Sequence, residues 1–210
     1  RVLFNFHEDT LCIQPGVAVY IMRQMLTGLE TLHSARYLHC DIKPMNIMLD
    51  PLGYVKIIDF GRANFINERT TLLLGTPSYM APEVHERKGT SIQSDLYSVG
   101  LVGLELLRGK PLVDQQNVSE SEWVRLKHEL PDRLPDMVPP YVRRNDQLVG
   151  ILKRLLHPDP KERFPDARSA ETTTDGLGLV HRQLSRLDID SDYRRDLATY
   201  INRLGYPKSR

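Results

Sequence analysis

Residues 39–61 read HCDIKPMNIMLDPLGYVKIIDFG, and this stretch decides the fold of the chain. Two short apolar runs flank a DPLG turn, which has proline in its second position and glycine in its fourth. This pattern favours a type I turn, so we predict a β-hairpin with strands at 47–49 and 55–57. A hairpin brings its two ends together, and Asn46 is therefore expected to lie near Asp59.

Polar residues that ordinary packing does not require surround this hairpin. Asp41, Lys43 and Asn46 precede the first strand, and Asp59 follows the second. Carboxylate and amide oxygens suit Mg²⁺, which usually takes one or two protein carboxylates and completes its shell with water and phosphate oxygens. The sequence therefore predicts a magnesium site at Asn46 and Asp59.

Three segments in this order resemble the eukaryotic-type protein kinases. Residues 39–46 (HCDIKPMN) are similar to the kinase catalytic loop, and residues 59–61 (DFG) resemble the metal-binding element that follows it. Residues 75–83 (GTPSYMAPE) are similar to the segment that closes the activation loop and forms the peptide platform. Lys43, two residues after the aspartate, and the Gly-Thr-Pro of the platform indicate the serine/threonine branch.

The resemblance implies a role for each polar residue in ATP-dependent phosphoryl transfer to serine and threonine hydroxyls of protein substrates. Asp41 is expected to orient the substrate hydroxyl and accept its proton, and Lys43 to neutralise the moving phosphoryl group. Asn46 and Asp59 are expected to hold Mg²⁺ across the ATP phosphates. Thr76 is expected to bond to both Asp41 and Lys43, which makes it part of the catalytic set.

Two further residues receive a role through the resemblance. Met48 is expected to form the floor under the adenine, which is compatible with an ordinary apolar strand position. His39 is expected to pack structurally beneath the DFG phenylalanine and to carry no acid–base chemistry. The residues expected to contact ATP are thus Lys43, Asn46, Met48 and Asp59.

The chain departs from the kinase pattern in two ways. No glycine-rich loop, strand lysine or helix glutamate precedes the catalytic loop, so we expect the N-terminal ATP-binding lobe to be absent and the chain to be inactive alone. Cys40 stands where kinases usually have an arginine that binds activation-loop phosphate, and Leu72 stands four residues before the platform threonine. Activity is therefore expected not to depend on phosphorylation of Thr70 or Thr71.

The expected fold is α+β: a protein kinase-like, mainly helical C-terminal lobe over residues 1–170, with a small hairpin that carries the catalytic elements. Apolar periodicity predicts long helices from Pro15 to about residue 32 and over residues 92–108. Shorter helices are expected at 122–130 and 147–156, and six prolines between residues 131 and 160 are expected to break the chain repeatedly.

Residues 171–210 are expected to form a C-terminal helical extension. Leu177, Val180 and Leu184 lie on one helical stripe, and Tyr193 begins a second stripe that ends before Gly205. These two amphipathic helices are expected to pack on the lobe or on a partner, and the lobe is the favoured surface.

The resemblance places three charged residues, Asp95, Glu83 and Arg163, inside the lobe. Asp95 is explained either as an acid at the positive end of a helix or as the buried aspartate that holds the catalytic-loop backbone in kinases. The resemblance also implies that Arg163 pairs with Glu83 of the platform, with an exposed arginine as the plainer alternative.

Composition narrows the possible partners and location of the chain. The 28 Lys and Arg residues balance 27 Asp and Glu residues, which disfavours nucleic acid and anionic membranes as partners. No apolar run approaches the ~20 residues that span a bilayer. Two cysteines are too few for a disulfide framework and favour a reducing, cytoplasmic location.

Three functions remain open at this point. The first is catalysis as part of a serine/threonine kinase, and the second is a non-catalytic scaffold built on a kinase lobe. The third is a small-molecule phosphotransferase of the wider superfamily, which generally lacks an APE-like platform. The intact catalytic residues favour the first.

Overall fold

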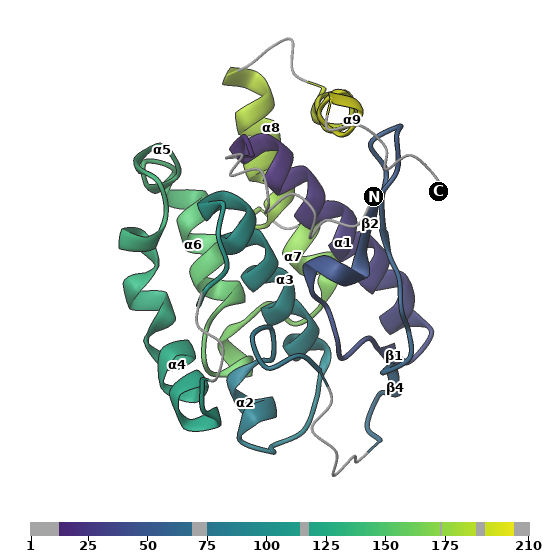
Figure 1. The fold of residues 1–210 in the computed structure, drawn as a ribbon, viewed down its shortest axis with the longest axis vertical. Helices are drawn as coiled ribbons and strands as arrows, with labels where there is room; N and C mark the ends of the chain where they lie inside the picture. The colour runs from purple at the N-terminus through teal and green to yellow at the C-terminus, as the bar shows by residue number, and fades with distance from the viewer. Residues whose placement is uncertain (1–12, 69–74, 114–117, 173, 188–191, 204–210) are drawn as a thin grey trace.

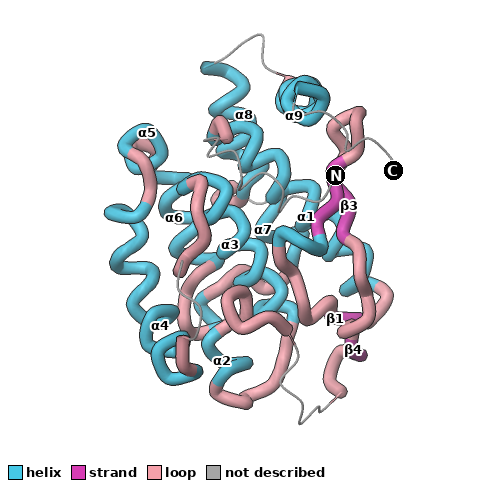
Figure 2. The backbone as a smooth tube through the Cα atoms, in the orientation of Figure 1, coloured by secondary structure: helices cyan, strands magenta, loops and turns pink. Residues whose placement is uncertain are grey.

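The computed structural model describes residues 13–68, 75–113, 118–172, 174–187 and 192–203. Helices dominate the fold, and the strands are confined to one side of the molecule (Figures 1 and 2). The elements in chain order are α1 (Pro15–Ser34), β1 (Tyr37–Leu38), η2 (Pro44–Asn46), β2 (Ile47–Leu49), β3 (Val55–Ile57), β4 (Asn64–Phe65), α2 (Pro82–His85), α3 (Ile92–Arg108), α4 (Glu120–Met137), α5 (Pro140–Arg143), α6 (Asp146–Leu155), η3 (Pro160–Glu162), α7 (Ala167–Thr172), α8 (Leu177–Leu187) and α9 (Tyr193–Arg203).

Helices α1 and α3 pack against each other in the middle of the core. Helix α3 is buried from Ser94 to Leu107, as its nearly continuous apolar sequence predicts. Ser91 caps its start in a reciprocal capping box with Ser94, and Gly109 ends it with a left-handed φ of 70°. The predicted boundaries of this helix are confirmed.

The predicted hairpin is also confirmed. Strands β2 and β3 pair antiparallel with Ile47 opposite Ile57, and the Gly53 amide closes the turn on the Asp50 carbonyl at 3.0 Å. Ile47 is fully buried, whereas Met48 is 39% exposed on the other face. Strands β1 and β4 form a second antiparallel pair that the sequence does not predict, because two residues are too few to show an alternating pattern.

The helix predicted at 122–130 is present but longer, and the expectation that the chain breaks at Pro131 and Pro135 is wrong. Helix α4 continues to Met137 with Pro131 and Pro135 inside it, although an internal proline costs about 3 kcal/mol. A capping box at Ser119 starts the helix. Residues at a spacing of three to four then bury one continuous face, and this burial outweighs the two missing hydrogen bonds; they are Trp123, Lys127, Leu130 and Leu134.

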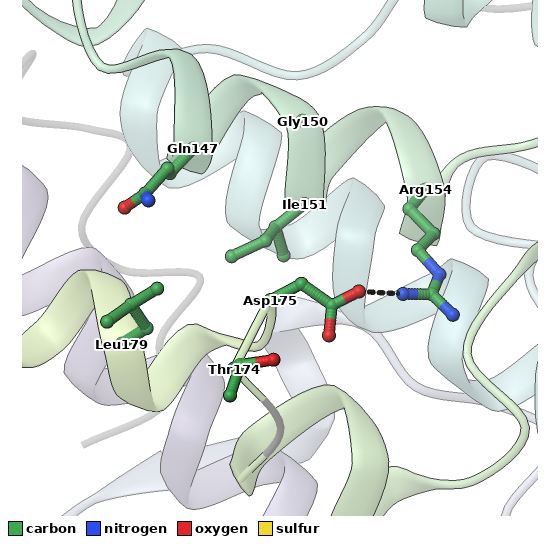
Figure 3. A pocket seen from close by; sticks show the side chains of 7 residues that line it. All are labelled: Gln147, Gly150, Ile151, Arg154, Thr174, Asp175 and Leu179. Atoms are coloured by element: carbon green, nitrogen blue, oxygen red, sulfur yellow. Dashed lines mark hydrogen bonds and ion pairs between the residues drawn. The ribbon is translucent and has the colours of Figure 1, made fainter.

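The two C-terminal helices pack on the lobe, as expected. Leu177 and Val180 of α8 are fully buried, and α9 buries Tyr193, Leu197 and Ile201. A small pocket of about 230 Å³ lies between α6 and the start of α8, and an ion pair joins Arg154 to Asp175 at its edge (Figure 3). The domain boundary at residue 170 stays a prediction.

The expected pair between Glu83 and Arg163 is confirmed. The guanidinium donates two parallel hydrogen bonds of 2.8 Å to the two carboxylate oxygens of Glu83. Arg163 is 2% exposed, and its remaining donors reach backbone carbonyls of Gln93, His157 and Pro158. The pair connects the platform to the segment after α6.

Replacing Arg163 with alanine should lower the free energy of unfolding by about 3–5 kcal/mol, because the Glu83 carboxylate would stay buried without its partner. Urea denaturation measures this loss. Arg168→Ala is the matched control, since its pair with Glu30 is mostly exposed and should be worth less than ~1 kcal/mol. Equal losses for the two variants would contradict the importance of the buried pair.

Candidate active site

Asp95 anchors the catalytic loop. Its side chain lies in the first turn of α3 and is 2% exposed. One carboxylate oxygen accepts the Cys40 amide at 2.9 Å, and the other accepts the His39 amide at 2.9 Å and lies 2.9 Å from His33 Nε2. Of the two explanations for this aspartate, the contacts favour the backbone anchor. The anchor holds Cys40 at a φ of 64°, which non-glycine residues rarely adopt.

The next residue, Asp41, forms a closed triangle with Lys43 and Thr76. Lys43 Nζ donates to Asp41 Oδ2 at 2.8 Å and to Thr76 Oγ1 at 2.9 Å. Thr76 Oγ1 donates to Asp41 Oδ1 at 2.8 Å. The contacts expected for Thr76 are therefore present, and they tie the start of the peptide platform to the catalytic loop.

The surroundings of Asp41 set its charge. Burial raises the pKa of this carboxyl, but the hydrogen bonds from Lys43 and Thr76 and the positive charges of Lys43 and Arg62 outweigh burial. The pKa consequently lies below its ordinary value, so Asp41 is ionised at neutral pH. An ionised carboxylate can orient a hydroxyl group and accept its proton.

Asn46 lies on the other side of Asp41, at the end of η2. Its amide nitrogen donates to the Asp41 carbonyl at 2.8 Å and to Asp41 Oδ2 at 3.3 Å. This orientation turns the amide oxygen, which is the end that binds a cation, away from those two bonds. The Asn46 carbonyl accepts the Ile58 amide at 2.9 Å, so the predicted approach of the two hairpin ends is confirmed at the backbone.

Asp59 follows Ile58 directly and has a φ of 63°. Its carboxylate is exposed and accepts the Gly61 amide at 3.2 Å. Within the described residues, Asp59 makes no hydrogen bond or ion pair to Asp41, Lys43 or Asn46. The structure thus brings four predicted residues into one hydrogen-bonded group and places Asp59 beside that group without direct contact.

The oxygen donors present fit a magnesium ion. Asp59 offers an exposed carboxylate and Asn46 an amide oxygen, and Mg²⁺ typically uses few protein ligands of this kind. In the part of the chain that the structure describes, no group of three or more His, Cys, Asp or Glu side chains suits a metal ion. The choice of Asn46 and Asp59 as ligands stays a prediction.

His39 makes two contacts at the DFG segment. The His39 ring meets the Phe60 ring edge-to-face with 5.4 Å between centroids, and its Nε2 lies 3.2 Å from the Ile58 carbonyl. The structural packing expected for His39 is confirmed. Phe60 is 52% exposed and Met48 is 39% exposed, and the adenine-floor role of Met48 is not tested by these contacts.

Lys127 is a site residue that the sequence analysis missed. It is fully buried, and its Nζ donates to the carbonyls of Pro77 and Met80 at 2.6 and 2.5 Å and lies 2.9 Å from His85 Nε2. Burial lowers the pKa of Lys127 well below its ordinary value. Burial and the charge of Lys127 lower the pKa of His85 to about 4. The available signal was a lysine in register with the buried face of α4, four residues after Trp123.

Arg62 connects the two described ends of the activation loop. Its Nη1 donates to the Gly75 carbonyl at 2.8 Å, and its Nε lies 3.8 Å from Asp41 Oδ2. Of the residues on which the expected independence from phosphorylation rests, Thr70, Thr71 and Leu72 lie outside the described residues.

Comparison with known proteins agrees with this geometry. A family model described as a protein kinase domain matches residues 1–172. The chain therefore belongs to the eukaryotic-type protein kinase family, in its serine/threonine branch.

Individual relatives are similar at a moderate level. The chain is 32% identical over 166 residues to serine/threonine-protein kinase PLK1 of Xenopus laevis, covering 78% of this chain and 26% of that protein. It is 33% identical over 173 residues to serine/threonine-protein kinase PknA of Corynebacterium glutamicum, covering 79% and 35%. Serine/threonine-protein kinase D3 of Mus musculus is 28% identical over 211 residues, covering 91% and 23%. The chain thus spans about a quarter to a third of the length of these relatives.

No helix in the described part has the length and apolar character needed to span a membrane.

The Cys40 thiol should react slowly in the folded protein. Burial, and then the negative charge of Asp95, raise the pKa of this thiol to about 12, so very little thiolate is present at pH 8. Iodoacetamide labelling followed by peptide mass spectrometry should show a rate at least about a hundredfold below that of the urea-unfolded chain. Labelling at the unfolded rate would contradict the partly buried position of Cys40 beside Asp95.

Proposed function

We propose that this chain forms the catalytic lobe of a kinase that transfers the γ-phosphoryl group of Mg-ATP to serine and threonine hydroxyls of protein substrates. The observation that carries the proposal is the hydrogen-bonded triangle of Asp41, Lys43 and Thr76 beside Asn46. Membership of the protein kinase family supports the reaction class.

In this proposal each site residue has its own role in the reaction. Mg-ATP, when bound, supplies the phosphoryl group and most of the charge neutralisation. Asp41 binds the attacking hydroxyl and accepts its proton; its lowered pKa makes it a weak base, which suits a loose transition state in which the proton leaves late. Lys43 lies beside Asp41 and donates to the transferred group, while Asn46 and Asp59 hold the metal. Thr76 keeps the peptide platform in register with Asp41.

An ATP-binding lobe completes the site in this proposal. Met48 and Phe60 are 39% and 52% exposed, and uncovered apolar side chains next to catalytic groups favour coverage by another part of the working enzyme. The 210-residue chain by itself is therefore proposed to bind Mg-ATP weakly. The low cysteine content supports the cytoplasm as the place of action.

Phosphoryl transfer should depend on Asp41 and Asp59. The test uses the longest natural polypeptide that contains these residues, with radiolabelled Mg-ATP and myelin basic protein as acceptor. Asp41→Ala and Asp59→Ala should each lower kcat by at least about a hundredfold, because each removes a group that acts on the transferred phosphoryl or its metal.

Asp132→Ala, an exposed position on α4, is the control and should leave kcat unchanged. A loss below about tenfold, or ~1.4 kcal/mol of barrier, for either active-site variant would refute its assigned role. A wild-type protein that transfers no phosphate would favour the non-catalytic scaffold instead.

A further inference from the structure

Helix α9 lies outside the matched kinase domain but contacts the catalytic hairpin. The family match ends at residue 172, and α9 begins at Tyr193. In Figure 1 this yellow helix lies next to the turn that joins β2 to β3, although the two are about 140 residues apart in the sequence. Figure 2 shows the same turn as a loop beside the α9 helix.

Both α9 and the turn contribute defined contacts to this interface. Arg194 Nη1 donates to the Tyr54 hydroxyl at 2.8 Å, and the guanidinium lies 5.2 Å from the centroid of the Tyr54 ring. Gly53 has a φ of 82°, and a Cβ atom at this position would lie 2.2 Å from the Arg194 carbonyl oxygen. The turn therefore requires glycine for its conformation and for the close approach of α9.

Helix α9 is itself firmly seated on the lobe. The Tyr193 ring occupies the space beside Gly16 of α1, where a Cβ atom would lie 2.2 Å from the ring. Leu197 and Ile201 are buried on the same face, and the Asp192 carboxylate accepts the first free amides of the helix. Because these contacts pack α9 on α1, Arg194 holds the turn against the surface of the lobe.

The opposite side of the turn is held by α1. Tyr20 donates its hydroxyl hydrogen to the Gly53 carbonyl at 3.1 Å. The turn is thus held between α1 and α9. Each hairpin strand has only three residues. Only a short stretch of chain therefore separates the turn from Asn46, which precedes β2, and from Asp59, which comes after β3. A two-stranded hairpin is marginally stable alone, which makes its orientation depend on such outside contacts.

We propose that α9 acts as a clamp on the catalytic hairpin and that Arg194 is a positioning residue for Asn46 and Asp59. The inference rests on the proposed function, because it assigns these two residues to the metal and nucleotide. In this inference the C-terminal extension has a role at the nucleotide site and none at the peptide platform. The platform is held by Lys127 and Arg163 on another side of the lobe.

The kinetic test uses the longest natural polypeptide with Arg194→Ala, Arg194→Lys and Arg195→Ala. Arg194→Ala should raise the KM for Mg-ATP threefold to tenfold and leave the KM for the protein substrate within twofold. Arg194→Lys should restore part of the loss, since an ammonium group can still lie over the Tyr54 ring. Arg195→Ala, the exposed neighbour, should match the wild type.

A second measurement needs no activity. Hydrogen exchange of the 210-residue chain should show amides of residues 47–58 exchanging at least threefold faster in Arg194→Ala, with α3 amides unchanged. A wild-type protein without phosphoryl transfer would refute the proposed function, and hairpin exchange would still decide whether the clamp exists. Unchanged hairpin exchange in Arg194→Ala, or equal rises in both KM values, would overturn the inference.

Discussion

The carboxylate of Asp95 is the contact on which the catalytic geometry depends. A buried carboxylate is costly unless several donors satisfy it, and here the amides of His39 and Cys40 and the His33 ring do so. Because α3 runs through the core and is capped at Ser91, the position of this carboxylate is fixed by a helix that is buried from Ser94 to Leu107. The loop backbone is held in turn, with Cys40 in its rare conformation and Asp41 directed toward Lys43 and Thr76.

The peptide platform is fixed by a second set of buried polar contacts. Thr76 joins its start to Asp41, Lys127 of α4 holds two of its carbonyls, and Arg163 holds Glu83 near its end. These contacts come from separate elements, so the platform geometry is a property of the whole lobe. Buried networks of this kind specify one arrangement because every alternative leaves a polar group unsatisfied.

Local signals in the sequence predicted much of this arrangement. The turn residues and apolar runs predicted the hairpin, and the bounds of α3 followed from its apolar periodicity. The continuation of helix α4 beyond residue 130 was not predicted because burial of one face, which depends on distant partners, outweighed Pro131 and Pro135. For the same reason the roles of Lys127 and Arg194 were missed: their partners lie 47 and 140 residues away in the chain. The motif residues of the site were identified by resemblance, whereas their mutual contacts required the fold.

The central claim is that Asp95 positions Asp41 for phosphoryl transfer. The most direct measurement is kcat of Asp95→Asn in the longest natural polypeptide, compared with Asp146→Asn, an exposed acid in the first turn of α6. Both substitutions remove a charge at a helix start, but only Asp95→Asn turns an amide nitrogen toward backbone donors. The account predicts a fall in kcat of at least about a hundredfold for Asp95→Asn with helical circular dichroism retained, and no change for Asp146→Asn. A kcat within twofold of wild type for folded Asp95→Asn would contradict it.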